Sequence, residues 1–568
     1  MKMNQGRWVI APERPEAEVL ASELRIPLPI ARILANRKVL SAEDAGAFLS
    51  GTLDDLHDPY LMKGMDRAVA RVEDAIRNKE KILVFGDYDV DGVLSVVILI
   101  RALAGLGAEV DYYIPERIKE GYGIKESHLR IVKERKARLV ISVDCGIKAV
   151  EFTAKAREAG VDVIITDHHR PGDSLPDAVA VLNPVLAESG YPFPNLAGVG
   201  VVFKLLQALL DKRGRSAQLQ HYAKLVAIGT IADVADLRGE NRLLVKSGLR
   251  GLEKASNRGL RRLLEECGVL DRKVSESDVG FRIAPRINAA GRMGNAEDAV
   301  RLFFSEDEAE SDRLARRLSE LNSQRQSAED KIYNEALRRV KEGSLDSRYK
   351  ILVLGCETWH RGIIGIVASK LKDFFYRPVL LFTYEDGKAH GSGRSVSEVS
   401  LIECLDACGD VFLDYGGHTL AVGCVLPRDK MSLLRERINR VVEGRLQGDE
   451  LQRRIKIDTR LSLAEIEAPF LEHYARLAPF GVGNPKPTFL SEGIEVAASP
   501  QVIQGKHLKV LARQDNRLIE ALAWDRKDWL EGVQKGARLD IVYSLRTSTF
   551  LGEEQHSLSL EDIRASEK

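Results

Sequence analysis

The chain has 568 residues, and its 84 basic and 84 acidic side chains give a formal net charge of zero. This length exceeds what one hydrophobic core supports and predicts three or four domains. The balanced charge excludes a uniformly basic nucleic-acid-binding protein, so local basic patches would have to meet any nucleic acid.

Cysteine usage and apolar patterning predict a cytoplasmic protein. Six cysteines in a chain of this size do not form a disulfide framework, and we interpret them as free thiols in a reducing cytosol. The first twenty residues lack the apolar stretch of a signal peptide. The longest apolar run, Val93 to Ile100, ends at Arg101 and is far shorter than the roughly 18 residues of a membrane span.

The N-terminal half predicts a parallel sheet covered by helices. We expect short helices without a chemical signature over residues 1–75 and an α/β domain over residues 76–295. In the α/β domain, short apolar runs alternate with helical patterns, which is typical of a parallel sheet. The expected strands are 81–86, 110–114, 139–143 and 161–166, and the expected helices are 92–106, 147–159, 198–211 and 218–229.

Three further segments follow. Residues 296–345 predict a long connecting helix of about 50 Å, which begins at the capping-box pair Ser305 and Glu308. An oligomerising coiled coil is the alternative interpretation of this helix. Residues 346–450 repeat the α/β pattern, and residues 451–568 contain five expected strands, which fit a small barrel of the OB type.

Acidic residues and one pair of histidines follow three of the strands of the first α/β domain. They are Asp87, Asp89 and Asp91 after the first strand, Asp144 after the third, and Asp167, His168 and His169 after the fourth. The carboxyl ends of parallel strands share one edge of a sheet, where open α/β folds bind ligands. A fourth acidic turn contains Asp233. Such crowded carboxylates repel one another unless cations neutralise them, and carboxylate with imidazole suits Mn²⁺ or Mg²⁺.

Each of these motifs also has an ordinary structural interpretation. A single aspartate at a strand end is usually a helix cap, and a histidine pair is usually a hydrogen-bonded surface pair. Three such motifs at successive strand ends, together with the fourth turn, favour a metal site over these interpretations.

The motifs carry a family resemblance. The segments that resemble the four motifs of the DHH phosphoesterases are GDYDVDG (86–92), VDCG (143–146), TDHH (166–169) and GTIADVADL (229–237). The segments that resemble the RecJ family within this superfamily are LAGVGVVFKLLQAL (196–209), PRINAAGRMGNAEDA (285–299) and LAPFGVGNPKPTF (477–489). The segments that resemble the DHH-associated substrate domain are HRGIIGIVASKL (360–371), GSGRS (391–395) and GGH (416–418).

The resemblance implies a hydrolase that depends on two divalent ions, Mn²⁺ or Mg²⁺. Such enzymes release mononucleotides from the 5′ end of single-stranded DNA during recombination and repair. The implied metal ligands are Asp89, Asp91, Asp144, His168 and Asp233, with Asp144 as the bridge between the ions. Asp87 is either a ligand or a supporting residue. Asp167 and His169 are expected to orient His168 or contact the phosphate, and His169 alternatively protonates the leaving oxygen.

Substrate contacts are expected from cationic and polar residues in the remaining motifs. They are Arg117, Tyr122, Arg286, Asn288, Arg292, Ser392, Arg394 and His418. The glycines around Ser392 and Arg394 suggest backbone N–H groups that approach a phosphate. Buried arginines that tie domains together are the alternative. The cleft between the two α/β domains is our hypothesis for a channel that excludes duplex DNA.

The C-terminal domain contains aromatic residues that suit either of two roles. Trp524, Trp529, Tyr543 and Phe550, with Lys506 and Lys509 nearby, are expected either to stack on bases of single-stranded DNA or to fill the barrel core.

Two other functions compete with the exonuclease. One is a DHH phosphodiesterase that cleaves short oligonucleotides or cyclic dinucleotides, and the other is a non-enzymatic DNA-binding scaffold. The partners implied by the family are single-stranded DNA, a single-stranded-DNA-binding protein and a repair helicase, without a membrane.

Overall fold

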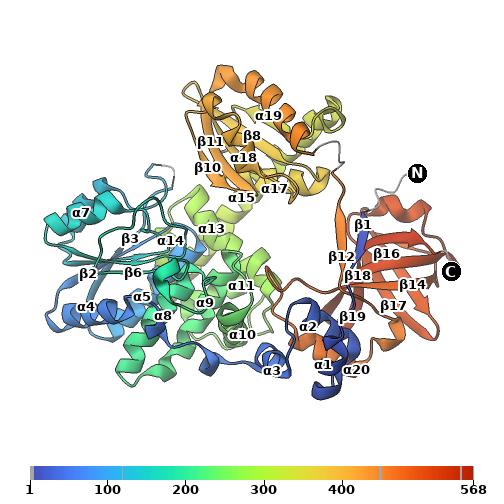
Figure 1. Cartoon of the computed structure of the whole chain (residues 1–568), viewed down its shortest axis with the longest axis horizontal. Coiled ribbons are helices and arrows are strands. Elements are labelled where there is room, and N and C mark those ends of the chain that lie inside the picture. The colour runs from blue at the N-terminus through green and yellow to red at the C-terminus, as the bar shows by residue number, and fades with distance from the viewer. Residues whose placement is uncertain (1–5, 118, 447–450, 551–552, 567–568) are drawn as a thin grey trace. The chain divides into compact units, whose positions relative to one another are not determined.

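The computed structural model describes residues 6–117, 119–446, 451–550 and 553–566 (Figure 1). The chain divides into two compact units. The first comprises residues 1–284 together with 454–568, and the second comprises residues 285–453. Among the described residues, no helix combines the length and the apolar character that crossing a membrane requires.

A five-stranded parallel sheet forms the centre of the first unit. Its strand order is β3-β2-β4-β5-β6. The bounds are β2 Lys81–Gly86, β3 Glu109–Tyr113, β4 Leu139–Val143, β5 Asp162–Thr166 and β6 Ala180–Leu182. The central strands are mostly apolar, as expected of a parallel sheet that helices cover on both faces. The sequence therefore predicts these strands well, but it does not reveal the three-residue β6.

Helices pack on both faces of this sheet. On one face, α6 (Leu129–Glu134) and α7 (Val150–Glu158) share a core with alternate strand residues such as Leu83 and Phe85. The other face carries α4 (Met65–Arg77), α5 (Val90–Gly105) and α8 (Gly198–Lys212) (Figure 1). The helices α9 (Leu219–Ala232) and α10 (Gly239–Leu252) pack beside them. The observed bounds confirm an α/β domain with a parallel sheet.

The C-terminal domain is a barrel-like sheet with strand order β13-β14-β18-β19-β17-β16-β15, and an additional β14–β16 pairing bends the sheet toward closure. Its strands are β13 Thr459–Arg460, β14 Thr488–Val496, β15 Gln501–Ile503, β16 His507–Gln514, β17 Arg517–Ala523, β18 Arg538–Phe550 and β19 Glu553–Ala565. The expectation of five strands is wrong. It lacks β19, which is mostly polar and places few apolar residues in the core. It also takes residues 493–503 as one strand, although they contain the end of β14 and all of β15.

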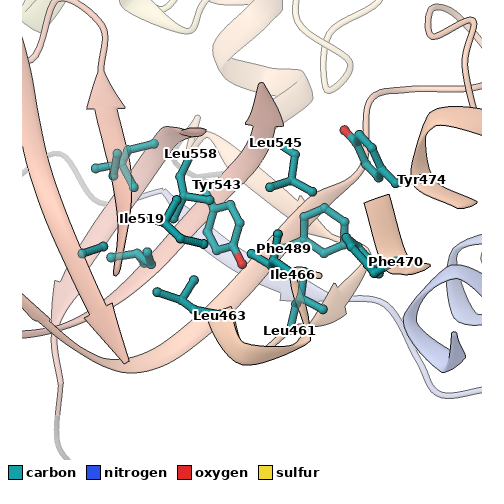
Figure 2. Close-up of a cluster of buried hydrophobic side chains, with 14 of the residues drawn as sticks. Leu461, Leu463, Ile466, Phe470, Tyr474, Phe489, Ile519, Tyr543, Leu545 and Leu558 are labelled. Carbon is teal, nitrogen blue, oxygen red and sulfur yellow. The ribbon is translucent and has the colours of Figure 1, made fainter. Parts of the chain in front are cut away.

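The N-terminal helices belong to the core of this C-terminal domain. The helices α1 (Glu16–Leu24), α2 (Leu28–Asn36) and α3 (Ala42–Ser50) share one apolar cluster with the barrel and with α20 (Ala468–Arg476). Figure 2 shows the barrel side of this cluster, where the rings of Phe489 and Tyr543 are neighbours with centres 5.8 Å apart. The strand β1 (Arg7–Ile10) also pairs in parallel with β12 (Arg454–Ile457). The two ends of the chain therefore fold together.

The second unit contains a mixed sheet with strand order β10-β11-β9-β8-β7. Its strands are β7 Leu352–Cys356, β8 Val379–Glu385, β9 Lys388–Arg394, β10 Asp414–His418 and β11 Ala421–Pro427. Its helices include α13 (Ala284–Met293), α14 (Glu297–Phe304), α15 (Glu308–Glu342), α16 (Leu345–Arg348), α17 (Ile364–Phe375), α18 (Leu401–Asp406) and α19 (Met431–Leu446).

The long helix of this unit begins two residues later than the capping pattern indicates. Asp307 is the N-cap of α15 and accepts the N–H of Glu310 at 2.7 Å. The hydroxyl of Ser305 instead donates to the Asp307 carbonyl oxygen and the Glu310 carboxylate. Two candidate capping residues, Ser305 and Asp307, lie two positions apart and make the start ambiguous in the sequence.

The shared core predicts that an N-terminal mutation destabilises the C-terminal barrel. Leu34→Ala removes a fully buried side chain from α2 and should cost about 2–5 kcal/mol. Hydrogen–deuterium exchange should then accelerate in β16 and remain unchanged in β2. The matched variant Leu99→Ala in α5 should show the reverse pattern. Unchanged exchange in β16 of the Leu34 variant would contradict the shared core.

Candidate metal centre

The turn between β2 and α5 places three aspartates at the edge of the sheet. Asp89 is the N-cap of α5, and its Oδ1 accepts the N–H groups of Asp91 at 2.9 Å and Gly92 at 3.1 Å. A Cβ on Gly92 would lie 2.5 Å from the carbonyl oxygen of Asp87, so only glycine fits this turn. One oxygen of Asp89 thus caps the helix. The turn and the start of α5 bring the carboxylates of Asp87, Asp89 and Asp91 to the same edge of the sheet.

Asp91 and Asp144 meet the N-terminus of α8. The carboxylate of Asp91 accepts the N–H groups of Gly198 at 2.7 Å and Val199 at 2.8 Å. Asp144 follows β4 in a left-handed conformation, and a Cβ on Gly198 would lie 2.7 Å from its Oδ1. Gly198 therefore allows the helix end to approach both carboxylates. The sequence does not predict this contact between α8 and the two aspartates.

The turn after β5 contributes an aspartate and two histidines. Asp167 is fully buried, and its Oδ1 accepts the N–H groups of His168 and His169 and lies 2.8 Å from His169 Nδ1. The amide of Asn183 donates to the carbonyl oxygen of His169 at 2.8 Å, a support that the sequence does not reveal. Asp233 caps the C-terminal end of α9, with its Oδ2 3.8 Å from His168 Nδ1.

The side chains form three groups whose ligand atoms lie within 4.8 Å of one another. The groups are Asp87, Asp89 and Asp144; Asp91, His168 and Asp233; and Asp144, His168 and His169. Asp144 occurs in two of them and lies between the others. The structure thus brings together every carboxylate and imidazole that the sequence singles out at this edge, apart from Asp167, which supports His169 from behind.

Buried atoms without hydrogen-bond partners show that the side chains of this centre suit a cation. Among the described residues, Asp87 Oδ1, Asp144 Oδ1 and His168 Nε2 are buried and make no hydrogen bond. His168 Nε2 and Asp144 Oδ1 are nevertheless 3.1 Å apart. Neighbouring ligands of an octahedral ion with bonds of about 2.1 Å are roughly 3.0 Å apart. Spacing and donor chemistry therefore fit a divalent ion such as Mg²⁺ or Mn²⁺.

Burial and mutual repulsion perturb the charges of the centre. Burial and the neighbouring Asp89 raise the pKa of Asp87 to about 8 and that of Asp91 to about 7. Burial and Asp91 raise the pKa of Asp233 to about 9, and burial raises that of Asp144 well above its usual value. These carboxylates need protons or cations to neutralise them.

The two histidines are shifted in opposite directions. Burial and the charge of His169 lower the pKa of His168 to about 4, so His168 is neutral at pH 7 and has a lone pair for a metal ion. Burial alone would lower the pKa of His169, but the hydrogen bond to Asp167 and the negative charges of Asp167, Asp91 and Asp87 together outweigh it and raise that pKa. The same hydrogen bond and backbone N–H groups overcome the effect of burial on Asp167 and lower its pKa.

Two predicted substrate residues lie at this centre. The hydroxyl of Tyr122 is 3.0 Å from His169 Nδ1 and 3.4 Å from the carbonyl oxygen of Asp144. The guanidinium of Arg117 lies 5.0 Å from the ring centre of Tyr88, in the turn that contains Asp87. Both residues come from the loop that follows β3, so this loop covers the metal centre from one side.

The other predicted substrate residues lie in the second unit. Arg286 and Asn288 are half-buried on α13, and Arg286 Nε donates to Ser319 Oγ on α15. Arg292 donates to the carbonyl oxygen of Gly362 at 2.9 Å, just before α17. These two arginine contacts join helices within the second unit. They are not contacts between domains, so the alternative interpretation of the arginines stays a prediction.

Ser392, Arg394 and His418 share one face of the second sheet. His418 pairs with Ala421, which pairs with Arg394, so the three positions form one row across β10, β11 and β9. Ser392 is two residues from Arg394, and both lie against Gly365 on α17. Burial lowers the pKa of Arg394. Arg394, Ser392 and His418 thus place a cationic, a hydroxyl and an imidazole group on the same face of the sheet.

The glycines of this segment have a different role from the predicted one. Gly391 and Gly393 lie inside β9, which pairs with β8 and β11 on its two sides, so their N–H groups belong to the sheet. A Cβ at Gly393 would lie 2.6 Å from Leu380, and one at Gly391 would collide with Phe382. The glycines therefore make room for the core, and the expectation that their N–H groups approach a phosphate is wrong.

The C-terminal aromatics divide between core and surface. Trp529 and Tyr543 are 1% and 0% exposed, and Tyr543 lies 2.9 Å from Ser491 Oγ inside the barrel (Figure 2). Trp524 is 43% exposed, and the guanidinium of Arg546 lies 5.0 Å from its ring centre. The side chain of Phe550 lies outside the described residues. Lys509 pairs with Glu520 and Lys506 with Asp525.

Three family models match separate parts of the chain. They are the DHH family N-terminal domain over residues 81–230, the DHHA1 domain over 348–444 and the RecJ OB domain over 457–562. The single-stranded-DNA-specific exonuclease RecJ of Bacillus subtilis (strain 168) is 38% identical over 571 residues, covering all of this chain and 72% of the relative. The RecJ of Escherichia coli (strain K12) is 32% identical, covering 97% of this chain and 98% of the relative.

Solved structures of RecJ proteins also match this chain. RecJ from Thermus thermophilus in complex with Mn²⁺ matches with a TM-score of 0.85 and 31% identity, covering all of this chain and 81% of that one. The complex of the same protein with Mg²⁺ matches with a TM-score of 0.78 and 30% identity, covering 99% of this chain and 79% of that one. Sequence and fold agree over the whole length: the chain belongs to the RecJ family of single-stranded-DNA-specific exonucleases.

Proposed function

We propose that this chain hydrolyses single-stranded DNA from its 5′ end, releases 5′-mononucleotides and acts in DNA recombination and repair. The observation that carries the proposal is the convergence of five carboxylates and two histidines at one sheet edge, with unsatisfied buried atoms on Asp87, Asp144 and His168. The mononucleotide product and the polarity follow from the family resemblance.

Two groups of the centre would hold two divalent cations. Asp87 and Asp89 would hold one ion, and Asp91, His168 and Asp233 would hold the other. Asp144 would be shared between the ions, as the family resemblance implies. When bound, the two ions polarise the scissile phosphate and stabilise the charge that develops on it. The N–H groups of Gly198 and Val199 orient the carboxylate of Asp91 toward its ion.

His169 and Tyr122 complete the site on the side of the substrate. The side chain of His169 is 42% exposed and that of His168 only 15%, so His169 is the imidazole that a substrate reaches. Asp167 fixes the orientation of His169, which contacts the phosphate or protonates the leaving oxygen. Tyr122 and Arg117, from the same loop, bind the terminal nucleotide.

Features outside the centre favour a long single strand over a dinucleotide substrate. The chain has a domain that matches the RecJ OB model, and its surface presents Trp524 beside Arg546. An exposed indole beside a guanidinium suits stacking on unpaired bases. The proposal also includes a single-stranded-DNA-binding protein and a repair helicase as partners, and the cytoplasm as the location.

Digestion of end-labelled strands tests the proposed function. With Mn²⁺, a 5′-labelled single strand should release labelled mononucleotide at once, a 3′-labelled strand should shorten progressively, and duplex should persist. Asp144→Asn should lower turnover by about a thousandfold, because it removes a bridging charge worth several kcal/mol. Asparagine has the same size and tolerates the left-handed conformation of residue 144, so the fold should persist.

The control for this experiment is Asp162→Asn, which removes a carboxylate that pairs with Arg71 at the start of β5. This variant should keep normal turnover. Activity restricted to dinucleotides would favour a short-oligonucleotide phosphodiesterase, and DNA binding without hydrolysis would favour a scaffold protein.

Trp524→Ala should weaken binding of long single strands. Loss of one stacked base contact costs about 1–3 kcal/mol, or roughly 5- to 150-fold in affinity. Fluorescence anisotropy with a long labelled strand measures this loss, while cleavage of a four-nucleotide substrate should remain unchanged. Leu518→Ala removes another exposed apolar side chain from the same domain and serves as the matched control. Equal affinities of the two variants would exclude Trp524 from DNA binding.

Arg394→Ala should raise the KM for single-stranded DNA by about tenfold or more, because a charge-assisted hydrogen bond contributes about 1.5–3 kcal/mol. The plot of log affinity against log salt concentration should become shallower by about 0.7, the slope of one phosphate contact on a single strand. Arg437→Ala, which breaks an ion pair with Asp410 in the same domain, should change neither quantity. An unchanged salt slope in the Arg394 variant would contradict a contact between Arg394 and a phosphate of the DNA.

A further inference from the structure

The turn that follows Asp233 has an unfavourable backbone conformation. Asp233 ends α9, and the next residue, Val234, has a φ of 59° although its side chain is β-branched and 66% exposed. A β-branched residue in the left-handed region is strained and persists only where its surroundings fix the backbone. The position of Asp233 therefore depends on whatever holds the turn.

Side chains of the first unit hold one side of this turn. The carboxylate of Asp236 accepts hydrogen bonds from Arg238 Nε at 2.9 Å and from Asn195 Nδ2 at 3.2 Å. The buried Asn241 donates to the carbonyl oxygen of Asp236 at 3.0 Å. These bonds fix Asp236 within three residues of Asp233.

A loop of the C-terminal part, residues 477–484, holds the other side. The carbonyl oxygen of Val482 accepts the N–H of the buried Leu237 at 2.8 Å. Gly483 has a φ of 74°, and a Cβ there would collide with the carboxylate of Asp236. A Cβ on Gly481 would lie 2.7 Å from Leu237 Cδ1. Both glycines therefore allow the loop to lie directly on the turn.

The loop itself is anchored from both directions. The fully buried Asn484 donates to the carbonyl oxygens of Leu477 at 2.9 Å and Pro479 at 2.7 Å. The buried guanidinium of Arg242, on α10, donates to the carbonyl oxygens of Leu477 and Ala478, both at 2.9 Å. The loop is thus a fixed support for the turn.

We infer that residues 477–484 are a positioning element for the metal centre, with Gly483 as the residue on which the contact depends. The loop holds the strained turn and so keeps the carboxylate of Asp233 aimed at His168 and Asp91. This inference rests on the proposed role of Asp233 as a metal ligand. It couples the C-terminal part of the chain to the affinity of one of the two cation sites.

Gly483→Ala tests the inference by direct metal binding. The electron paramagnetic resonance signal of free Mn²⁺ reports the number of bound ions and their affinities without any turnover. The variant should bind one of the two ions about tenfold more weakly, which is typical when a group that orients a ligand is lost. Gly505→Ala is the matched control, because Gly505 has nearly the same φ of 72° but has open space around its missing Cβ.

Asp236→Ala provides a second route in case the glycine variant does not fold. It removes the hydrogen bonds from Arg238 and Asn195 and should weaken the same Mn²⁺ site. In both variants, nuclease activity should recover at high Mn²⁺ concentration, which a merely structural defect would not allow. Wild-type affinity at both sites in the two variants would overturn the inference alone, whereas a wild-type protein that binds no Mn²⁺ would overturn the proposed function.

Discussion

Repulsion among buried carboxylates governs the architecture of the metal centre. Asp91 and Asp144 are almost inaccessible to water, and they lie within a few ångströms of three other aspartates. Such a cluster is stable only with compensation from helix N-termini, protons or cations. The N-terminus of α8 supplies part of this compensation to Asp91, and His168 remains neutral. Metal binding, and the hydrolysis that it would support, therefore follow from the need to neutralise these buried carboxylates.

The sequence predicted which carboxylates and imidazoles gather at this sheet edge, because the signals for them are local. Apolar strands that end in aspartates identify a sheet edge without knowledge of the tertiary fold. The supporting contacts were harder to predict, since they join segments far apart in the chain. Asn183 holds the backbone of His169, and Gly198 makes room beside Asp144. Neither residue type indicates a partner without the fold.

Predictions failed or stayed open where a residue type has two common roles. The glycines at 391 and 393 suggested a phosphate-binding loop, but they lie in a paired strand whose neighbours fill their side-chain space. Trp529 and Tyr543 are in the barrel core, whereas Trp524 is on the surface. Only the tertiary fold decides between core and surface for an aromatic residue in a short strand. The sequence also did not predict β19, because most of its residues are polar and a polar segment resembles a loop.

The shared core of α1–α3 and the barrel has a consequence for synthesis of the protein. The N-terminal helices leave the ribosome well before the barrel strands, but their apolar residues pack against those strands. Contacts with such a large separation in sequence form slowly. Until the barrel strands have been made, residues such as Ile30 and Leu34 have no native partner in the barrel, and nascent chains with exposed apolar surface are prone to aggregate. A chaperone that shields this segment during translation would therefore raise the yield of folded enzyme.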